Sequence, residues 1–273
     1  MVGRSEEQYV SDTQIDSSTP HAARRYDYWL GGKDNFAADR ASGDAIAAAF
    51  PAVRTWAIEN RAFMRRAVAY LAREAGIRQF LDVGTGIPTS PNLHEVVQEI
   101  APESRVVYVD NDPLVLTHAR ALMNSATPQG KVAYLDADLH HPDAILGSDE
   151  VKQTLDLREP VALTLVAVLH FFRDADDPYQ IVRMLIDALP AGSYLAISHA
   201  TWDHLPPEAV PESVKQAQAN EAQLRNKAEF ERFFTGLELV EPGISVVSEW
   251  KDDRSERPDP SQVSCYGAVA RIP

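Results

Sequence analysis

The sequence predicts an α/β fold, in which a doubly wound, mostly parallel sheet carries one antiparallel C-terminal strand and an N-terminal helical cap. Three observations predict it. Residues 40–76 repeat apolar side chains at the three- and four-residue spacing of helices. After Gly76, short apolar runs alternate with loops and helix-start signals, which is the pattern of repeated βα units. The last two apolar runs, 243–247 and 263–272, have no crossover helix between them and therefore predict a hairpin.

The N-terminal part divides into a tail and a cap. Residues 1–20 are polar and are expected to form a flexible tail. Residues 21–76 are expected to form the helical cap, with two helices separated at Pro51 and a C-terminal stop at Gly76. Residues 77–273 then form the sheet domain, as one structural unit with the cap.

Five apolar runs are predicted to be strands buried on both faces, as in a parallel sheet covered by helices on both sides. These runs are 78–83, 105–110, 132–135, 161–169 and 193–198. Three helices are predicted to begin at a proline behind a capping residue, because the missing proline N–H costs nothing in a first turn. These prolines are Pro91, Pro113 and Pro178. A polar helical stretch at 207–234, an apolar run at 236–240 and a hairpin loop at 249–260 complete the chain.

Composition narrows the classes of partner. The chain has 273 residues, with 26 basic against 40 acidic side chains and a net charge of −14. Nucleic-acid binding needs clustered Lys and Arg, and no such run occurs, so composition favours small-molecule or protein partners, and of these we expect a small-molecule substrate. No run approaches the roughly 20 apolar residues of a membrane span, and no signal-peptide pattern begins the chain, so we expect a cytoplasmic protein without membrane contact. The single Cys265 excludes an internal disulfide and is expected to be a buried strand residue. The oligomeric state is left open.

The strongest local motif is Asp82-Val-Gly84-Thr85-Gly86, at the end of the first predicted strand. Glycines there let a turn bring backbone amides close to a ligand. A dinucleotide fingerprint would continue to a third glycine, but that position is Thr89. The Asp82 carboxylate would also repel a pyrophosphate, whereas it suits a ligand with positive charge. S-adenosylmethionine (SAM), with its sulfonium and ammonium groups, is such a ligand.

Acidic residues end the next two strands in the same register. Asp110, followed by Asn111, is placed to accept hydrogen bonds from ribose hydroxyls, a feature that SAM and NAD sites share. For Asp112 we favour helix capping. After the third strand, Asp138 is placed to accept the exocyclic amine of adenine while the backbone of Leu139 meets a ring nitrogen.

This order of motifs resembles that of the class I SAM-dependent methyltransferases. The segment 166–172 (VAVLHFF) is similar to their fourth-strand motif, which implies that the backbone of Ala167 lies near the methionine end of SAM. More specifically, residues 23–40 (ARRYDYWLGGKDNFAADR) and 80–89 (FLDVGTGIPT) resemble an actinomycete family of S-adenosyl methyltransferases formerly catalogued as a domain of unknown function. The resemblance runs from about residue 20 to the C-terminus. It implies a Rossmann-like methyltransferase sheet with SAM as cofactor and S-adenosylhomocysteine (SAH) as product, but no particular substrate. Pro88 departs from the general class, where many members carry the third glycine.

The aromatic segment 26–36 precedes the first strand and could fold over the cofactor as a lid, with Tyr26, Tyr28 and Asn35 facing the ligand. The alternative is that its aromatic side chains only dock the N-terminal helices onto the sheet. Both interpretations stay open at this stage. Three basic residues near this segment are candidates for binding an anionic substrate: Arg24, Arg25 and Lys33.

Two histidines are candidate general bases. His170 follows the fourth strand and His199 ends the fifth, and either could accept a proton as a methyl group is transferred. The alternative is a structural role, because many methyl transfers need only positioning and desolvation of a good nucleophile. No metal site is predicted, since the adjacent His140 and His141 lie in a loop where Asp138 is already explained by adenine.

The sequence therefore predicts a SAM-dependent methyltransferase that acts on an unidentified, small-molecule acceptor. The first alternative is a SAM- or SAH-binding regulatory protein, because every motif above concerns the cofactor and none identifies an acceptor. A nicotinamide-dependent oxidoreductase is disfavoured by Thr89 and Asp82. A purely structural module would not explain three strand-end acids in register.

Overall fold

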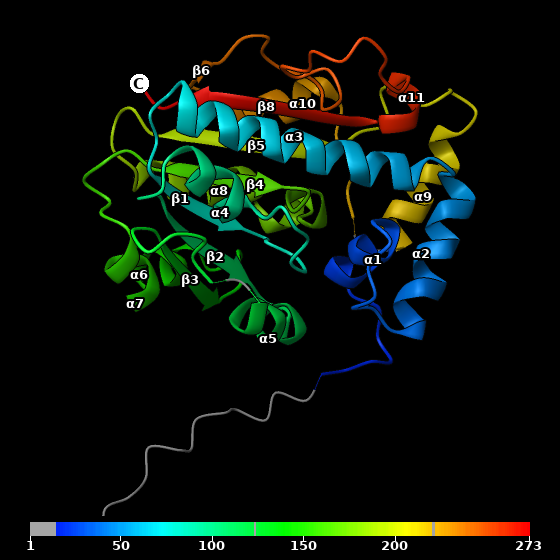
Figure 1. The fold of residues 1–273 in the computed structure, drawn as a ribbon. Coiled ribbons are helices and arrows are strands. Elements are labelled where there is room, and N and C mark those ends of the chain that lie inside the picture. The colour runs from blue at the N-terminus through cyan, green and yellow to red at the C-terminus, as the bar shows by residue number, and fades with distance from the viewer. Residues whose placement is uncertain (1–14, 123, 220–221) are drawn as a thin grey trace, which may run out of the picture.

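The computed structural model describes residues 15–122, 124–219 and 222–273, which form an eight-stranded sheet between layers of helices (Figure 1). The strand order is β3-β2-β1-β4-β5-β8-β6, and β7 pairs with β8. The first five strands are parallel, and β8 runs antiparallel to β5, β6 and β7, as predicted. The strands are β1 (Gln79–Val83), β2 (Arg105–Asp110), β3 (Lys131–Asp136), β4 (Ala162–Val166), β5 (Tyr194–Ala200), β6 (Glu238–Leu239), β7 (Ser245–Val246) and β8 (Cys265–Arg271).

The parallel strands are apolar on both faces because each face packs on its own helices. In β1, Phe80 packs into a core with the long helix α3 (Val53–Arg73), whereas Leu81 and Val83 pack into the core on the other face. The helix α4 (Leu93–Ile100) lies beside α3. The opposite core contains residues of α6 (Pro142–Gly147), α7 (Asp149–Thr154) and α8 (Pro178–Asp187).

Three helices lie beyond the carboxyl ends of the parallel strands rather than on a sheet face (Figure 1). They are α1 (Ala22–Trp29), α2 (Ala37–Ala49) and α9 (Val210–Ala219), and α2 contacts both α1 and α9. The remaining helices are α5 (Pro113–Leu122), α10 (Lys227–Glu231) and α11 (Pro260–Val263), with 3-10 turns at Leu169–Phe171, Asp174–Asp176 and Arg232–Phe234. None of the helices in the described ranges is both long and apolar enough to cross a membrane.

Several predicted boundaries are wrong. The helix expected from Pro91 begins at Leu93, because the Asn92 backbone N–H donates to the Glu95 carboxylate and so starts the helix there. The fourth strand stops at Val166, since Ala167 has a φ of 57° that no strand accommodates. The described part of the stretch 207–234 contains two helices and a 3-10 turn, and residue 263 ends α11 instead of starting the last strand.

The N-terminal segment reaches the fold earlier than the expected boundary at residue 20. Residues 1–14 of that expected tail lie outside the described residues. Ile15 packs against a small cluster formed by Ile87, Leu114 and Val115, and the Asp16 carbonyl accepts a hydrogen bond of 2.6 Å from Arg24 Nη1. The segment therefore approaches the sheet edge formed by the turns after β1 and β2.

Candidate active site

A cavity of about 780 Å³ lies at the carboxyl ends of the parallel strands, a volume typical of small-molecule sites. The strand ends form one side of it, and α1, α2, α3 and α9 contribute the other. All nine residues that the sequence predicts for the cofactor line this cavity: Asp82, Gly84, Thr85, Gly86, Asp110, Asn111, Asp138, Leu139 and Ala167. Parallel strands bring their ends to one edge of the sheet, which is why residues so far apart in sequence meet here.

The turn after β1 depends on its glycines. Gly84 and Gly86 have φ values of +79° and +68°, in the left-handed region that glycine adopts without strain. Asp82 precedes the turn and is buried, and its Oδ1 accepts a 2.5 Å hydrogen bond from Thr164 Oγ1 on the neighbouring strand. Burial raises the pKa of the Asp82 carboxyl to about 6. Asp82 is therefore a buried carboxyl that can exchange a proton near neutral pH.

Asp110 ties the first two strand ends together. Its Oδ2 accepts a 2.8 Å hydrogen bond from the Gly86 N–H, and its Oδ1 accepts one of 3.0 Å from the Asp112 N–H. Burial raises the pKa of this carboxyl too. Each carboxylate oxygen has a second lone pair, so Asp110 retains the capacity to accept from ligand hydroxyls. Asn111 beside it is exposed at the cavity.

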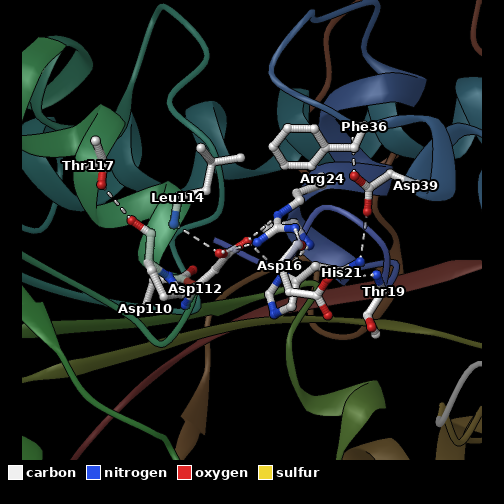
Figure 2. Close-up of polar contacts among 12 residues, drawn as sticks. Asp16, Thr19, His21, Arg24, Phe36, Asp39, Asp110, Asp112, Leu114 and Thr117 are labelled. Atoms are coloured by element: carbon white, nitrogen blue, oxygen red, sulfur yellow. Dashed lines mark hydrogen bonds and ion pairs between the residues drawn. The ribbon is translucent and has the colours of Figure 1, made fainter. Parts of the chain in front are cut away.

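Asp112 is held by a buried ion pair with α1. Figure 2 shows Arg24 and Asp112 pointing toward one another, with bonds of 2.9 Å from Nε and 2.8 Å from Nη2 to the two carboxylate oxygens. His21 Nδ1 lies 3.1 Å from Asp112 Oδ2, and the expected capping bond is present at 2.9 Å from the Leu114 N–H. Arg24, which the sequence suggested for an anionic substrate, is therefore paired inside the protein.

The third strand end is more open. The Asp138 side chain is 41% exposed, and its Oδ1 accepts bonds from the His140 backbone N–H at 2.9 Å and from His140 Nδ1 at 2.7 Å. Partial burial opposes ionisation, but these bonds outweigh it and lower the pKa of Asp138. Leu139 is buried beside it. In the described residues, no group of three or more His, Cys, Asp or Glu side chains is arranged to hold a metal ion.

The end of β4 directs its backbone toward β5. Ala167 adopts its left-handed conformation while its N–H donates to Ser198 Oγ at 3.0 Å. His170 follows in the 3-10 turn, lines the cavity and is buried, with the Trp56 ring edge-on at 6.0 Å. Burial and the charges of Arg225 and Arg25 lower the pKa of His170 to about 3, so its ring is neutral. Its Nδ1 has no hydrogen-bond partner in the described residues.

His199 is enclosed by the protein instead. Its Nδ1 lies 2.8 Å from the Ala200 carbonyl and its Nε2 3.0 Å from Arg225 Nη1. Because the first contact requires a donor and the second an acceptor, the ring is the neutral Nδ1–H tautomer. Burial lowers the pKa of His199 well below its ordinary value. His199 does not line the cavity, so this geometry gives it a structural role and not that of a general base.

Of the three residues expected to face the ligand from a lid, one lines the cavity and two do not. Tyr26 lines the cavity, with its hydroxyl donating to the Ala57 carbonyl at 2.9 Å. Tyr28 is on the other side of α1 and donates to Asp44 at 2.8 Å, while Asn35 Nδ2 donates to Asp27 at 2.8 Å. Neither of these two lines the cavity. Residues two apart on a helix point in different directions, which sequence spacing alone should have indicated.

Sequence reasoning missed much of the wall opposite the strand ends. Arg61 of α3 lines the cavity, and its neighbours there come from α1, α2, α3 and the chain on either side of α9. Most of these are apolar or aromatic: Trp29, Ile46, Phe50, Trp56, Phe171, Leu205 and Leu224. The helical periodicity of 40–76 identified buried positions but carried no sign of which ones face a cavity.

A model of the S-adenosyl methyltransferase family matches residues 8–273, which is nearly the whole chain. The chain belongs to the S-adenosyl methyltransferase family. A solved DUF574 family protein from Streptomyces avermitilis is 52% identical, with a TM-score of 0.90 over 95% of this chain and 100% of that one. A candidate methyltransferase from Thermobifida fusca is 40% identical, with a TM-score of 0.87 over 97% and 99% of the two chains.

A more distant solved structure shares the fold of this family member. The mitomycin 7-O-methyltransferase MmcR is 16% identical, with a TM-score of 0.51 over 80% of this chain and 55% of its own. That likeness shows the methyltransferase fold alone. No functionally curated protein matches the chain.

Proposed function

We propose that this protein transfers a methyl group from SAM to a small-molecule acceptor, and that the cavity at the strand ends is where both bind. One observation carries the proposal. The nine residues that the sequence motifs and their family resemblance predict for SAM line a single cavity in a member of the S-adenosyl methyltransferase family.

The side chains present match the groups that SAM would bring. Asp82 offers a buried negative charge to an ammonium group. Asp110 offers acceptor lone pairs to ribose hydroxyls, and Asp138 offers them to an adenine amine. When bound, SAM supplies a methyl group activated by its sulfonium. The cavity residues would hold it, orient it and exclude water around it.

The acceptor is proposed to occupy the apolar part of the cavity. Trp29, Phe50 and Trp56 line this part and would exclude water from the methyl group and its target. His170 lies among them as a neutral ring, which could accept a hydrogen bond from the acceptor but is a weak base, because its pKa is about 3. Catalysis would therefore rest on alignment of an acceptor atom that is already nucleophilic.

The proposal is tested by isothermal titration of the protein with SAM, SAH and NADH in parallel. We expect SAM and SAH to bind and NADH not to bind. Asp138→Ala should weaken SAM binding by roughly tenfold, because it removes one hydrogen bond to adenine. Asp253→Ala is the matched control, since Asp253 is exposed and does not line the cavity. Absence of SAM binding, or binding of NADH in its place, would contradict the proposal.

Binding of SAM should also depend on the ionisation of Asp82. With a pKa of about 6, raised from 3.8 by burial, this carboxyl is charged above pH 7 and neutral at pH 5. Only the charged form attracts an ammonium, so affinity should level off near pH 7, where the ligand amine (ordinary pKa about 8) is still protonated, and fall roughly tenfold per unit below pH 6. Titrations between pH 5 and 8 measure this slope. The Asp82→Asn variant should bind SAM more weakly, and the slope of its log affinity against pH below pH 6 should be smaller by about one. An unchanged slope in that variant would contradict the assignment of the ammonium to Asp82.

A further inference from the structure

Arg61 brings a positive charge to the cavity at the end where Asp82 lies. It extends from α3, and its Nη2 donates to three uncharged oxygens: the carbonyl of Thr89, the carbonyl of Pro91 at 3.3 Å and Asn92 Oδ1 at 3.3 Å. No carboxylate in the described ranges forms an ion pair with it. Its Nε is buried without a hydrogen-bond partner among those residues. An unpaired guanidinium that lines a cavity is poised to bind an anion.

Three amides of the glycine turn, those of Gly84, Thr85 and Gly86, are already used within the protein and are not free to bind that anion. The N–H groups of Gly84 and Thr85 donate to the Val109 carbonyl, at 2.9 and 3.2 Å. The N–H of Gly86 donates to Asp110, and Pro88 has no N–H to offer.

Beyond Pro88, the Thr89 N–H donates to Asn92 Oδ1 at 2.9 Å. That same oxygen accepts from Arg61 Nη2, so one Asn92 side chain holds both the end of the loop and the guanidinium. A carboxylate near this turn would thus find its charged donor in the Arg61 side chain, since the N–H groups of Gly84, Thr85, Gly86 and Thr89 are already bonded.

We propose that Asp82 and Arg61 together form a site for a zwitterionic α-amino acid group, with the ammonium of SAM on Asp82 and its α-carboxylate on Arg61. The two charges come from different elements, β1 and α3, and both line the same cavity. The guanidinium is close enough that its charge opposes the effect of burial on the Asp82 carboxyl. This inference rests on the proposed function and adds the group that binds the carboxylate of SAM. It also makes α3 part of the cofactor site.

The test compares SAM with decarboxylated SAM, which keeps the sulfonium and the amine but lacks the carboxylate. By isothermal titration, wild-type protein should bind SAM more tightly than decarboxylated SAM. Arg61→Gln should weaken SAM binding by roughly 10- to 100-fold and leave decarboxylated SAM within about threefold, because only the charge-assisted contact is lost. Arg61→Lys, which keeps the charge, should recover part of the loss. Arg65→Gln is the control, because Arg65 lies one turn further along α3 and does not line the cavity.

The outcomes separate the two proposals. Equal weakening of both ligands by Arg61→Gln would mean that Arg61 only supports the loop at Thr89 and Pro91, and would overturn the inference while leaving SAM binding intact. Unchanged SAM affinity in the variant would overturn it as well. Failure of the wild-type protein to bind either compound would overturn the proposed function, and the zwitterion site with it. Thermal unfolding of each variant shows whether a loss of binding reflects a loss of folding.

Discussion

Replacing Arg24 with alanine is expected to lower the free energy of unfolding by roughly 3–5 kcal/mol, because it leaves the Asp112 carboxylate buried without its cation. Both side chains are at most 5% exposed and share two hydrogen bonds. The pair connects α1 to the end of β2, and α1 carries Tyr26 and Trp29 into the cavity. Arg24→Ala should therefore also weaken SAH binding. Urea denaturation followed by tryptophan fluorescence measures the first effect, and isothermal titration the second.

The matched control is Arg78→Ala. Arg78 pairs with Glu103 at a similar distance of 2.7 Å, but the two side chains are 42% and 56% exposed. An exposed pair contributes about 0–1 kcal/mol, so the control should hardly change stability. Similar losses of unfolding free energy in the two variants would mean that the buried Arg24–Asp112 pair contributes no more to stability than an exposed pair.

The effect of Arg24→Ala should shrink in acid. Burial of Asp112 opposes ionisation, but hydrogen bonds from His21 and Arg24 outweigh it and hold the pKa well below its usual range. A depressed folded-state pKa gives a contribution that is complete above the unfolded value of about 4 and is lost as the pH falls toward the folded value. The stability difference between wild type and variant should accordingly narrow below pH 4.

Arg225→Met is expected to cost roughly 3–4 kcal/mol, because the fully buried guanidinium is the donor to several buried acceptors. Its Nη1 bonds the Leu169 carbonyl at 3.3 Å and His199 Nε2 at 3.0 Å. Its Nη2 bonds the Phe172 carbonyl at 2.9 Å and Asp174 at 2.8 Å. The variant should also raise the pKa of His199, since a neighbouring cation is removed. Urea denaturation and NMR titration of the histidines measure the two effects.

Arg183→Met serves as the control for this variant. Arg183 pairs with Asp187 on the surface of α8, with both side chains more than half exposed, so its loss should stay within about 0.5 kcal/mol. If Arg225→Met lowered the free energy of unfolding as little as Arg183→Met, the turn that carries His170 would be held by its own packing and not by Arg225.

The fold could be predicted because its signals are local and repeat along the chain. Apolar runs such as 105–110 pack on both faces of the sheet and so appear as continuous hydrophobic segments. The boundaries that failed depend on single contacts. Asn92 starts α4 only because its backbone N–H reaches Glu95, and β4 stops where Ala167 turns toward Ser198.

The strand-end part of the candidate site was accessible to the same reasoning, because parallel strands place consecutive motifs along one edge. The different positions of the two candidate histidines could not be predicted in this way. His170 and His199 occupy comparable positions after neighbouring strands, yet one lines the cavity and the other is enclosed by Arg225 and Ala200. Their separation is decided by Arg225, which lies far along the chain from both.

By itself, then, the sequence determined the doubly wound sheet, its antiparallel last strand and the acids at the strand ends, since each follows from periodicity or from a motif within one βα unit. Only the tertiary structure decided which charges remain available. Arg24 and Arg61 both lie on N-terminal helices, but Arg24 meets Asp112 in a buried pair, whereas Arg61 donates to carbonyl and amide oxygens beside the cavity and to no carboxylate among the described residues. The physical reason is that the energy of a charge depends on its partners and burial in three dimensions, neither of which is encoded by spacing along the chain.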